Sequence, residues 1–172
     1  SHTAWHGSLI AGALHLPMPM PSLWYRASLH YDDQGTIRHV HGYTLPGLPL
    51  TIVGTNEHLA WTVTNGQVNG CDIVYSNGGQ ALPVVSSAIE RIAVRGGADV
   101  FLPVEETIYG PIRPQPFGDL RGIVHWVAHE EGSVNLDWML LEQALSVEDA
   151  VRAAHAFRLP AMNLIVGDTR GH

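Results

Sequence analysis

The chain has 172 residues, of which 45% are hydrophobic and 15% are charged, a composition that suits one globular domain or part of a larger one and argues against disorder. All nine basic residues are arginine and the formal net charge is −7, so the sequence offers no polybasic face for nucleic acid. The single cysteine, Cys71, cannot form an internal disulfide, and no apolar run approaches the ~20 residues that span a bilayer. We therefore expect neither a nucleic-acid nor a membrane partner.

The first forty residues predict short strands separated by proline and turn residues. The apolar run Ser8–Gly12 is typical of a strand, and the three prolines at positions 17, 19 and 21 force an extended passage after it. Strand-like patterns cover Leu23–Tyr31 and Thr36–His41, and the segment between them, Asp32–Gly35, has the composition of a turn. This order predicts a hairpin.

The stretch Leu45–Tyr75 carries most of the functional argument. Its centre is Leu59–Thr64, a run of strand-favouring residues that stops at Asn65-Gly66. An Asn-Gly pair allows the backbone to turn sharply and to leave an N–H directed away from the sheet. A strand that ends in this way is a good position for a binding or catalytic site.

The second half predicts another hairpin and then the only strong helical signals. Ile89–Val94 and Val100–Ile108 flank a glycine-rich loop, which is typical of a hairpin, and Gly122–His129 is expected to be extended. A short helix is expected at Trp138–Gln143. The last expected strand is Met162–Val166, closed by Gly167-Asp168.

A longer helix is predicted over Ser146–Phe157. Ser146 and Asp149 have the spacing of a capping box, and the helix is broken by Pro160. Four apolar residues fall on one helical face and are expected to pack on the sheet: Val147, Ala150, Val151 and Ala154.

Eleven histidines raise the question of a metal site. His39 and His41 are two apart on an expected strand and so share a face, and His125 and His129 are two strand periods apart. Neither pair has a third ligand nearby in the sequence, which disfavours a structural zinc site. The chain also contains no G-x-S-x-G elbow and no glycine-rich phosphate loop.

Several motifs in one order resemble the penicillin acylase family of N-terminal nucleophile hydrolases. They span nearly the whole chain: Ala11-Gly12-Ala13-Leu14-His15-Leu16, Pro21-x-x-Trp24-Tyr25, Pro46-Gly47-Leu48-Pro49, Gly54-x-Asn56, Leu59-Ala60-Trp61, Thr64-Asn65, Asp72-Ile73-Val74-Tyr75, and Ala144–Phe157 followed by Pro160-Ala161-Met162-Asn163 and Gly167-Asp168. The resemblance implies an α+β fold, part of an αββα sandwich that is dominated by strands and has a C-terminal helical stretch.

The resemblance also implies an amidase whose nucleophile is an N-terminal serine and whose base is the α-amino group of that serine. An α-amino group titrates near 7.7–8.0, so a useful fraction is neutral at working pH and can take the hydroxyl proton. By motif position, the backbone N–H of Asn65 and the side-chain amide of Asn163 are expected to hold the oxyanion. His15 occupies the family's His or Gln position close to the nucleophile.

Two alignments place the nucleophile differently. Without gaps, Ser1-His2-Thr3-Ala4 falls on the family's S-R-T-A segment, so the nucleophile is expected several residues before Ser1. The other alignment makes Ser1 the nucleophile and Trp5 the tryptophan of the family's S-N-x-W start, but it shortens the first hairpin. The ungapped alignment is preferred because it preserves every spacing through His15.

The family's calcium position departs from its usual pattern in this chain. Asn69 replaces the first acid of D-x-x-D, so Asp72 and neutral oxygens are left to bind a hard cation. A structural calcium is therefore expected to be weak at best, and the chemistry requires no cofactor.

We interpret residues 1–172 as a single domain or as a fragment of a catalytic β-subunit. The expected partners are the rest of that subunit, an α-subunit and a small N-acyl amide, such as a β-lactam side chain or an acyl-homoserine lactone. The fragment alone is expected to be inactive, and the resemblance suggests a periplasmic or secreted location. The competing hypothesis is a degenerate, non-catalytic homologue that keeps the fold and a ligand groove.

Overall fold

A computed structural model describes residues 3–4, 6–17, 19–75 and 83–172. The chain divides into two compact units, residues 1–68 with 134–172 and residues 69–133. None of the described helices is long and apolar enough to cross a membrane. The elements of the first unit are, in chain order, β1 (Tyr25–Asp33), β2 (Thr36–Thr44), β3 (Val53–Thr55), β4 (Leu59–Asn65), the 3₁₀ helix η2 (Asp137–Met139), α1 (Leu140–Gln143), α2 (Val147–Ala154) and β10 (Met162–Asp168).

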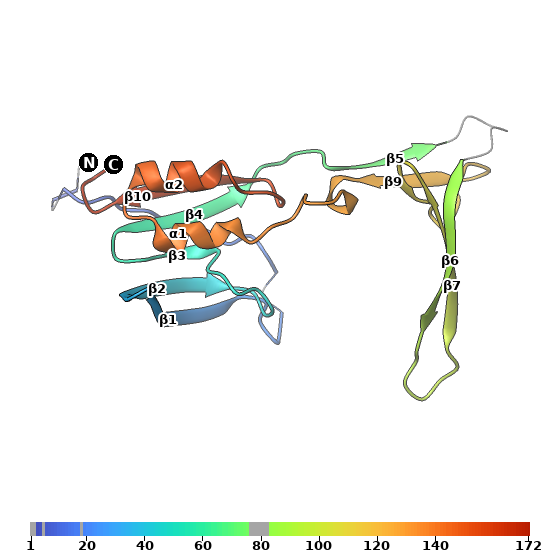
Figure 1. The fold of residues 1–172 in the computed structure, drawn as a ribbon, viewed down its shortest axis with the longest axis horizontal. Helices are drawn as coiled ribbons and strands as arrows, with labels where there is room; N and C mark the ends of the chain where they lie inside the picture. Colours follow the sequence, from blue (N-terminus) through green and yellow to red (C-terminus); the bar gives the residue numbers. More distant parts are fainter. Residues whose placement is uncertain (1–2, 5, 18, 76–82) are drawn as a thin grey trace. The chain divides into compact units, whose positions relative to one another are not determined.

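A five-stranded antiparallel sheet in the order β1-β2-β3-β4-β10 forms the first unit, with α1 and α2 on one face (Figure 1). The hairpin β1–β2 turns at Gln34-Gly35, where both residues have positive φ, and it confirms the predicted hairpin. The other three strands pair antiparallel as well, and β10 lies beside β4 although about one hundred residues separate them.

The core lies between the helices and the face of β4 that carries Leu59, Trp61 and Val63. These alternate residues are 2%, 1% and 6% exposed and share one face of the strand. Thr62, on the other face, is also only 2% exposed. From the helical side, Leu141 and Ala150 complete the same cluster. The predicted strand and both predicted helices are therefore confirmed, with shifts of a few residues at their ends.

The side chain of Asn56 joins the β3–β4 turn to the end of α1. Its Nδ2 donates to the carbonyl oxygens of Leu141, Glu142 and Ala144 at 2.7–3.2 Å. Its Oδ1 accepts from the backbone N–H groups of His58 and Leu59. Because the last carbonyls of a helix lack partners within the helix, this amide satisfies groups that burial would otherwise leave unpaired.

Glu142 is 3% exposed and ties α1 to the opposite part of the sheet. One carboxylate oxygen accepts from the backbone N–H of Thr51 at 2.8 Å, and the other accepts from the Tyr31 hydroxyl at 3.4 Å. Burial and then the Glu142 carboxylate raise the pKa of Tyr31 above its ordinary value. A buried carboxylate without a cation is tolerated here because both of its oxygens have donors.

Two expectations about the first unit are wrong. Ser8–Gly12 forms no strand; the segment lies against the sheet, where Ser8 approaches Gly167 and Gly12 approaches Thr62. The buried face of α2 consists of Ala150 and Ala153, whereas Val151 is 51% exposed. The helix is rotated about its axis relative to the prediction, because contact with the sheet, and not the apolar pattern alone, determines which helical face is buried.

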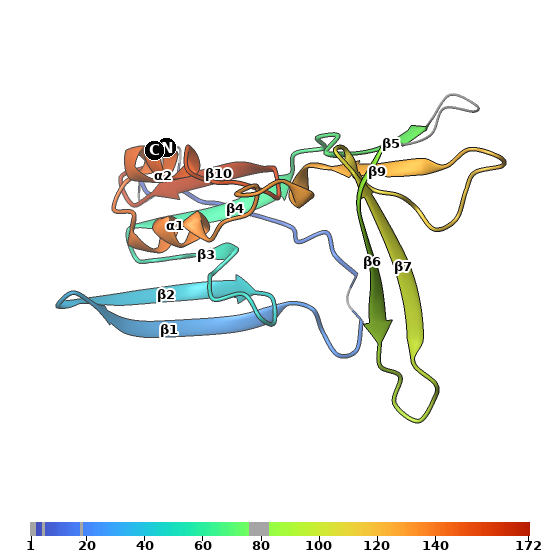
Figure 2. The ribbon, with the colours of Figure 1, turned by 45° about the vertical axis from the view of Figure 1, so that its right-hand side comes forward.

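The described residues of the second unit form strands and one 3₁₀ turn (Figure 2). Its hairpin β6–β7 confirms the predicted hairpin, and β5 pairs antiparallel with β9. Gly122–His129 was expected to be extended throughout, but its last three residues form the 3₁₀ helix η1. The elements are β5 (Cys71–Tyr75), β6 (Val84–Ile92), β7 (Val100–Thr107), β8 (Gly110–Pro111), β9 (Gly122–Trp126) and η1 (Val127–His129).

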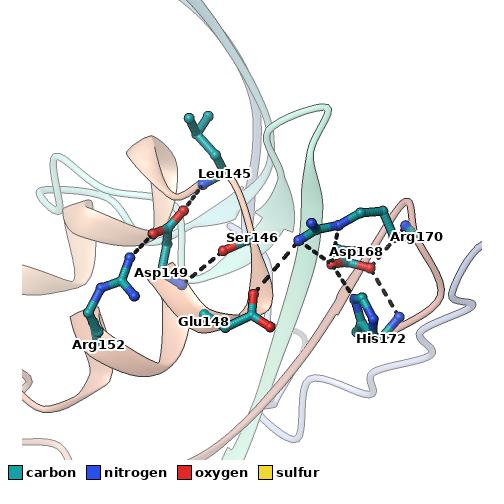
Figure 3. Close-up of polar contacts among 8 residues, drawn as sticks. All are labelled: Leu145, Ser146, Glu148, Asp149, Arg152, Asp168, Arg170 and His172. Carbon is teal, nitrogen blue, oxygen red and sulfur yellow. Dashed lines mark hydrogen bonds and ion pairs between the residues drawn. The ribbon is translucent and has the colours of Figure 1, made fainter.

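The carboxylate of Asp168 organises the turn that follows β10 (Figure 3). Its side chain is 1% exposed and accepts from the backbone N–H and the side chain of both Arg170 and His172. Arg170 also pairs with Glu148 of α2 at 3.7 Å. Burial by itself raises the pKa of Asp168, but the hydrogen bonds from His172 and Arg170 outweigh it and hold the pKa well below its usual range.

Replacing Asn56 by alanine is expected to lower the free energy of unfolding by about 3 kcal/mol, since it leaves several buried backbone groups without partners. Urea unfolding followed by far-UV circular dichroism measures the change. The matched control is Asn69→Ala, at an exposed asparagine, for which the change should stay within about 0.5 kcal/mol. Equal effects of the two substitutions would contradict the role of Asn56.

The low pKa of Asp168 predicts a loss of stability in acid. Because the folded-state pKa lies below the ordinary value of 3.8, Asp168 contributes stability that is present above about pH 4 and is lost as the pH falls toward the folded-state pKa. Urea midpoints measured from pH 7 to pH 3 should fall less steeply for Asp168→Asn than for the unchanged chain. Equal slopes for Asp168→Asn and the unchanged chain would contradict this role of Asp168. So would an equally reduced slope for the control Asp72→Asn, at an exposed site.

Candidate functional site

The end of β4 and the start of β10 bring Asn163, Thr64 and Asn65 together. Asn163 is the cross-strand partner of Thr64, so both side chains lie on one face of the sheet. The Asn163 Nδ2 atom donates to Thr64 Oγ1 at 3.1 Å and to the carbonyl oxygen of Asn65 at 3.2 Å. All three residues are exposed, so this cluster of polar groups is accessible to a ligand.

The backbone N–H of Asn65 is directed away from β10. Gly66 N–H donates to the carbonyl of Ala161 at 3.1 Å, and in an antiparallel ladder neighbouring N–H groups point to opposite sides. On that opposite side β3 pairs with β4 only at Ala60 and Trp61. The Asn65 N–H therefore lies beyond the paired part of β3.

The turn after β4 is fixed by its own sequence. Asn65 Oδ1 accepts from the N–H of Gln67 at 2.9 Å, which is an Asx turn. A Cβ atom at Gly66 would lie 2.8 Å from the Ala161 carbonyl oxygen, so the close approach of β10 requires glycine there. These two features explain why the strand ends at the predicted position.

A cavity of about 710 Å³ opens beside this turn, within the first unit. Thr64, Asn65 and His15 are among the residues that line it. Most of the remaining wall is apolar, and its larger side chains include Trp24, Leu45, Leu48, Leu50, Ile52 and Trp138. The arrangement places polar groups beside a volume that suits an apolar ligand.

One wall of the cavity is rigid because Trp138 stacks on Phe157. The two rings are 4.5 Å apart between centroids at an interplanar angle of 18°. Trp138 is only 7% exposed and belongs to the buried cluster under the sheet. The cavity is therefore bounded by the same packing that holds α1 and α2 in place.

The sequence-predicted site residues fall into three groups. His15, Asn65 and Asn163 lie around the cavity or one hydrogen bond from its lining, and their catalytic roles stay predictions. Ser1 lies outside the described residues. Asn69 and Asp72 belong to the second unit.

Asn69 and Asp72 form a poor donor set for calcium. Asn69 Nδ2 donates to Asp72 Oδ1 at 3.2 Å, and both side chains are exposed. Calcium takes six to eight oxygen ligands, usually with more than one carboxylate. This pair alone does not fit the ion.

His125 and His129 do not act as a pair. His125 Nδ1 lies 3.0 Å from the Tyr109 carbonyl oxygen, and the His129 ring meets the edge of Trp126. The two histidines have separate neighbours, because the chain leaves the extended conformation at η1 before His129 is reached.

Sequence reasoning missed the apolar wall of the cavity. Leu50 and Ile52 lie just before β3 and Trp138 lies in η2, so residues far apart in the sequence meet in one cluster at the cavity wall. The signal that was available is the Pro-Gly-x-Pro turn at residues 46–49, which returns an apolar segment to the sheet.

The sequence profile of the penicillin amidase family matches residues 1–172. Acyl-homoserine lactone acylase QuiP of Pseudomonas aeruginosa is 24% identical over 188 residues, covering 95% of this chain and 22% of that protein. Acyl-homoserine lactone acylase PvdQ of Pseudomonas putida is 32% identical over 141 residues, covering 74% of this chain and 16% of that protein.

The fold is similar to a thermostable penicillin G acylase from Alcaligenes faecalis, with a TM-score of 0.70 and 24% sequence identity over 88% of this chain and 29% of that chain. The chain belongs to the penicillin amidase family. Its mostly antiparallel sheets with few helices agree with that solved structure. It spans about a fifth of the length of the curated relatives described above.

Proposed function

We propose that this chain is part of an amidase that hydrolyses a linear N-acyl amide, with the acyl part bound in the apolar cavity. The observation that carries the proposal is the pairing of Asn163 with Thr64 and Asn65 beside that cavity. Membership in the penicillin amidase family and the acylase names of the relatives support the same reaction class. The whole protein would supply the remaining subunit segments and an α-subunit.

The architecture we propose is half of an αββα sandwich. The five-stranded sheet with α1 and α2 on one face supplies one helical layer and one sheet layer. The segment Ser8–Gly12 lies on the opposite face, against Thr62 and Gly167, and we propose that a second sheet packs on that side. Thr64 and Asn163 share that opposite face. A site between two sheet layers would exclude water and strengthen its hydrogen bonds.

The proposed mechanism passes through an acyl-enzyme. An N-terminal serine hydroxyl attacks the amide carbonyl while its own neutral α-amino group takes the proton. The proton then goes to the leaving amine, and water hydrolyses the resulting ester by the same route. The nucleophile belongs to a part of the protein upstream of Ser1, or to Ser1 itself in the alternative alignment.

The tetrahedral oxyanion would be held by the N–H of Asn65 and the amide of Asn163. The Asn65 N–H is directed away from β10, and the Asn163 amide reaches its position by exchanging one of its two present hydrogen bonds for the oxyanion. Donors placed in advance stabilise charge that appears only in the transition state. His15, on the same cavity, would position the nucleophile.

The competing function is ligand binding by a degenerate homologue that keeps the fold and lacks the nucleophile. The cavity would serve such a protein equally well. The sequence upstream of Ser1 in the parent gene distinguishes the enzyme from the degenerate homologue. In the ungapped alignment the nucleophile lies about eight residues before Ser1, so a Gly-Ser self-cleavage junction at that position would favour the enzyme.

In a complete, active parent enzyme, Asn163→Ala should lower kcat by about 10²–10³, the usual loss for one oxyanion donor. The free energy of unfolding should change little, because the side chain is exposed and its strongest partner forms only in the transition state. Steady-state kinetics on a chromogenic acyl amide and a urea titration measure both quantities. Asn69→Ala is the control and should leave kcat unchanged; an unaltered kcat in Asn163→Ala would exclude the oxyanion role.

The isolated 172-residue chain should not turn over phenylacetyl or fatty-acyl amides, because base and nucleophile are one residue that the preferred alignment puts upstream of Ser1. A chromogenic acyl amide assay with the purified chain tests this. Turnover that is abolished by Ser1→Ala would show instead that the alignment with the shortened hairpin is correct.

A further inference from the structure

The hydroxyl group of Thr64 is a side-chain partner of the Asn163 amide. Thr64 lies in β4 and Asn163 directly opposite it in β10, and the two strands run side by side (Figure 1). Asn163 Nδ2 donates to Thr64 Oγ1 at 3.1 Å. Directly opposed residues of an antiparallel pair have Cβ atoms about 4.5–5.5 Å apart, so the strand register itself sets this contact.

Both hydrogens of the Asn163 amide nitrogen are in use. One is donated to Thr64 Oγ1, and the other is donated to the carbonyl oxygen of Asn65 at 3.2 Å. A carbonyl oxygen can only accept, so it requires the nitrogen, and not Oδ1, at that position of the amide. To donate to an oxyanion, the nitrogen must release one of these two acceptors. The contact that is kept then decides how the amide is oriented in the transition state.

The contact with the Asn65 carbonyl is the one that an oxyanion would replace. The N–H and the C=O of one strand residue point to the same side, as the paired exchange of hydrogen bonds in an antiparallel ladder requires. Because the Asn65 N–H is directed away from β10, the hydrogen that Asn163 gives to the Asn65 carbonyl already lies toward that side of β4. Redirecting this hydrogen to an oxyanion on the Asn65 N–H leaves the hydrogen bond to Thr64 intact.

Thr64 is suited to hold the amide through the reaction. Its β-branched side chain has few accessible χ1 rotamers, and its backbone lies within the paired part of β4. The preceding residue, Val63, is 6% exposed and belongs to the buried core. The terminal torsion of an asparagine side chain is otherwise broad, so the hydroxyl restrains a rotation that a donor placed in advance of the charge cannot retain.

We propose that Thr64 is a positioning residue for the amide hydrolysis. Its hydroxyl oxygen accepts from Asn163 Nδ2 throughout the reaction and so directs the second hydrogen of that nitrogen at the oxyanion. The inference rests on the proposed function, in which Asn163 is an oxyanion donor. Thr64 contacts no reacting atom in this role and acts through Asn163. Because Thr64 also lines the cavity, its effect on the amide must be measured separately from its effect on substrate binding.

Two substitutions of Thr64 in the full-length, active parent enzyme test the proposal. Thr64→Val removes the hydroxyl and keeps the shape, so it should lower kcat about tenfold and leave KM within about twofold, because a misdirected donor loses transition-state stabilisation and not ground-state binding. Thr64→Ser keeps the accepting oxygen and should retain kcat within about threefold. The inhibition constant of a phosphonate analogue of the tetrahedral intermediate should rise in Thr64→Val by the factor by which kcat falls.

The double variant Thr64→Val/Asn163→Ala distinguishes positioning from a separate structural role. If Thr64 acts through Asn163, the double variant should lose no more kcat than Asn163→Ala alone, whereas independent roles would multiply the two losses. Thr36→Val, at an exposed threonine of β2, is the matched control and should leave kcat unchanged. Circular dichroism of each variant shows whether the fold is retained.

The proposal is overturned if Asn163→Ala loses activity while Thr64→Val keeps full kcat. It is also overturned if Thr64→Ser is as slow as Thr64→Val, if the losses multiply in the double variant, or if Thr36→Val lowers kcat as much as Thr64→Val. An unaltered kcat in Asn163→Ala would instead overturn the oxyanion assignment, and the role of Thr64 with it. Failure of this inference is therefore distinguishable from failure of the proposed function.

Discussion

The amide of Asn56 is the interaction on which the arrangement of the first unit depends. It satisfies three carbonyl oxygens at the end of α1 and two N–H groups at the start of β4. The helical segment that it holds begins just after Trp138, which forms a wall of the apolar cavity. The Asn56 amide therefore supports both the packing of α1 under the sheet and the wall of the cavity at the end of β4. A buried amide suits this role because it can both donate and accept hydrogen bonds.

The second constraint is the pairing of β10 with β4. It joins residues about one hundred positions apart and puts Asn163 within hydrogen-bond distance of Thr64 and Asn65. Gly66 permits the close approach of the backbones, and the Asx turn at Asn65 ends the strand there. A site at paired strand ends has rigid supports on both sides, which an oxyanion site requires because its donors must be in position before the charge develops.

Local sequence predicted the strands and helices well because their signals are local: apolar alternation, turn residues and the cap at Ser146, whose Oγ accepts from Asp149 N–H. It failed for Ser8–Gly12, since an apolar run says nothing of whether a strand partner is available, and the segment packs on the sheet face instead. Asn65 and Asn163 were found through motifs and not through periodicity. The register of the whole β1–β2 hairpin could also have been predicted, because a two-residue turn at Gln34-Gly35 fixes it.

The most direct measurement is a crystal structure of the full-length parent with a phosphonate analogue of the tetrahedral intermediate, which mimics the transition state. We expect the anionic oxygen about 2.7–3.1 Å from both the Asn65 N–H nitrogen and Asn163 Nδ2, with the acyl chain in the cavity beside Trp138. An oxygen held by other donors, or an acyl chain outside this cavity, would contradict it.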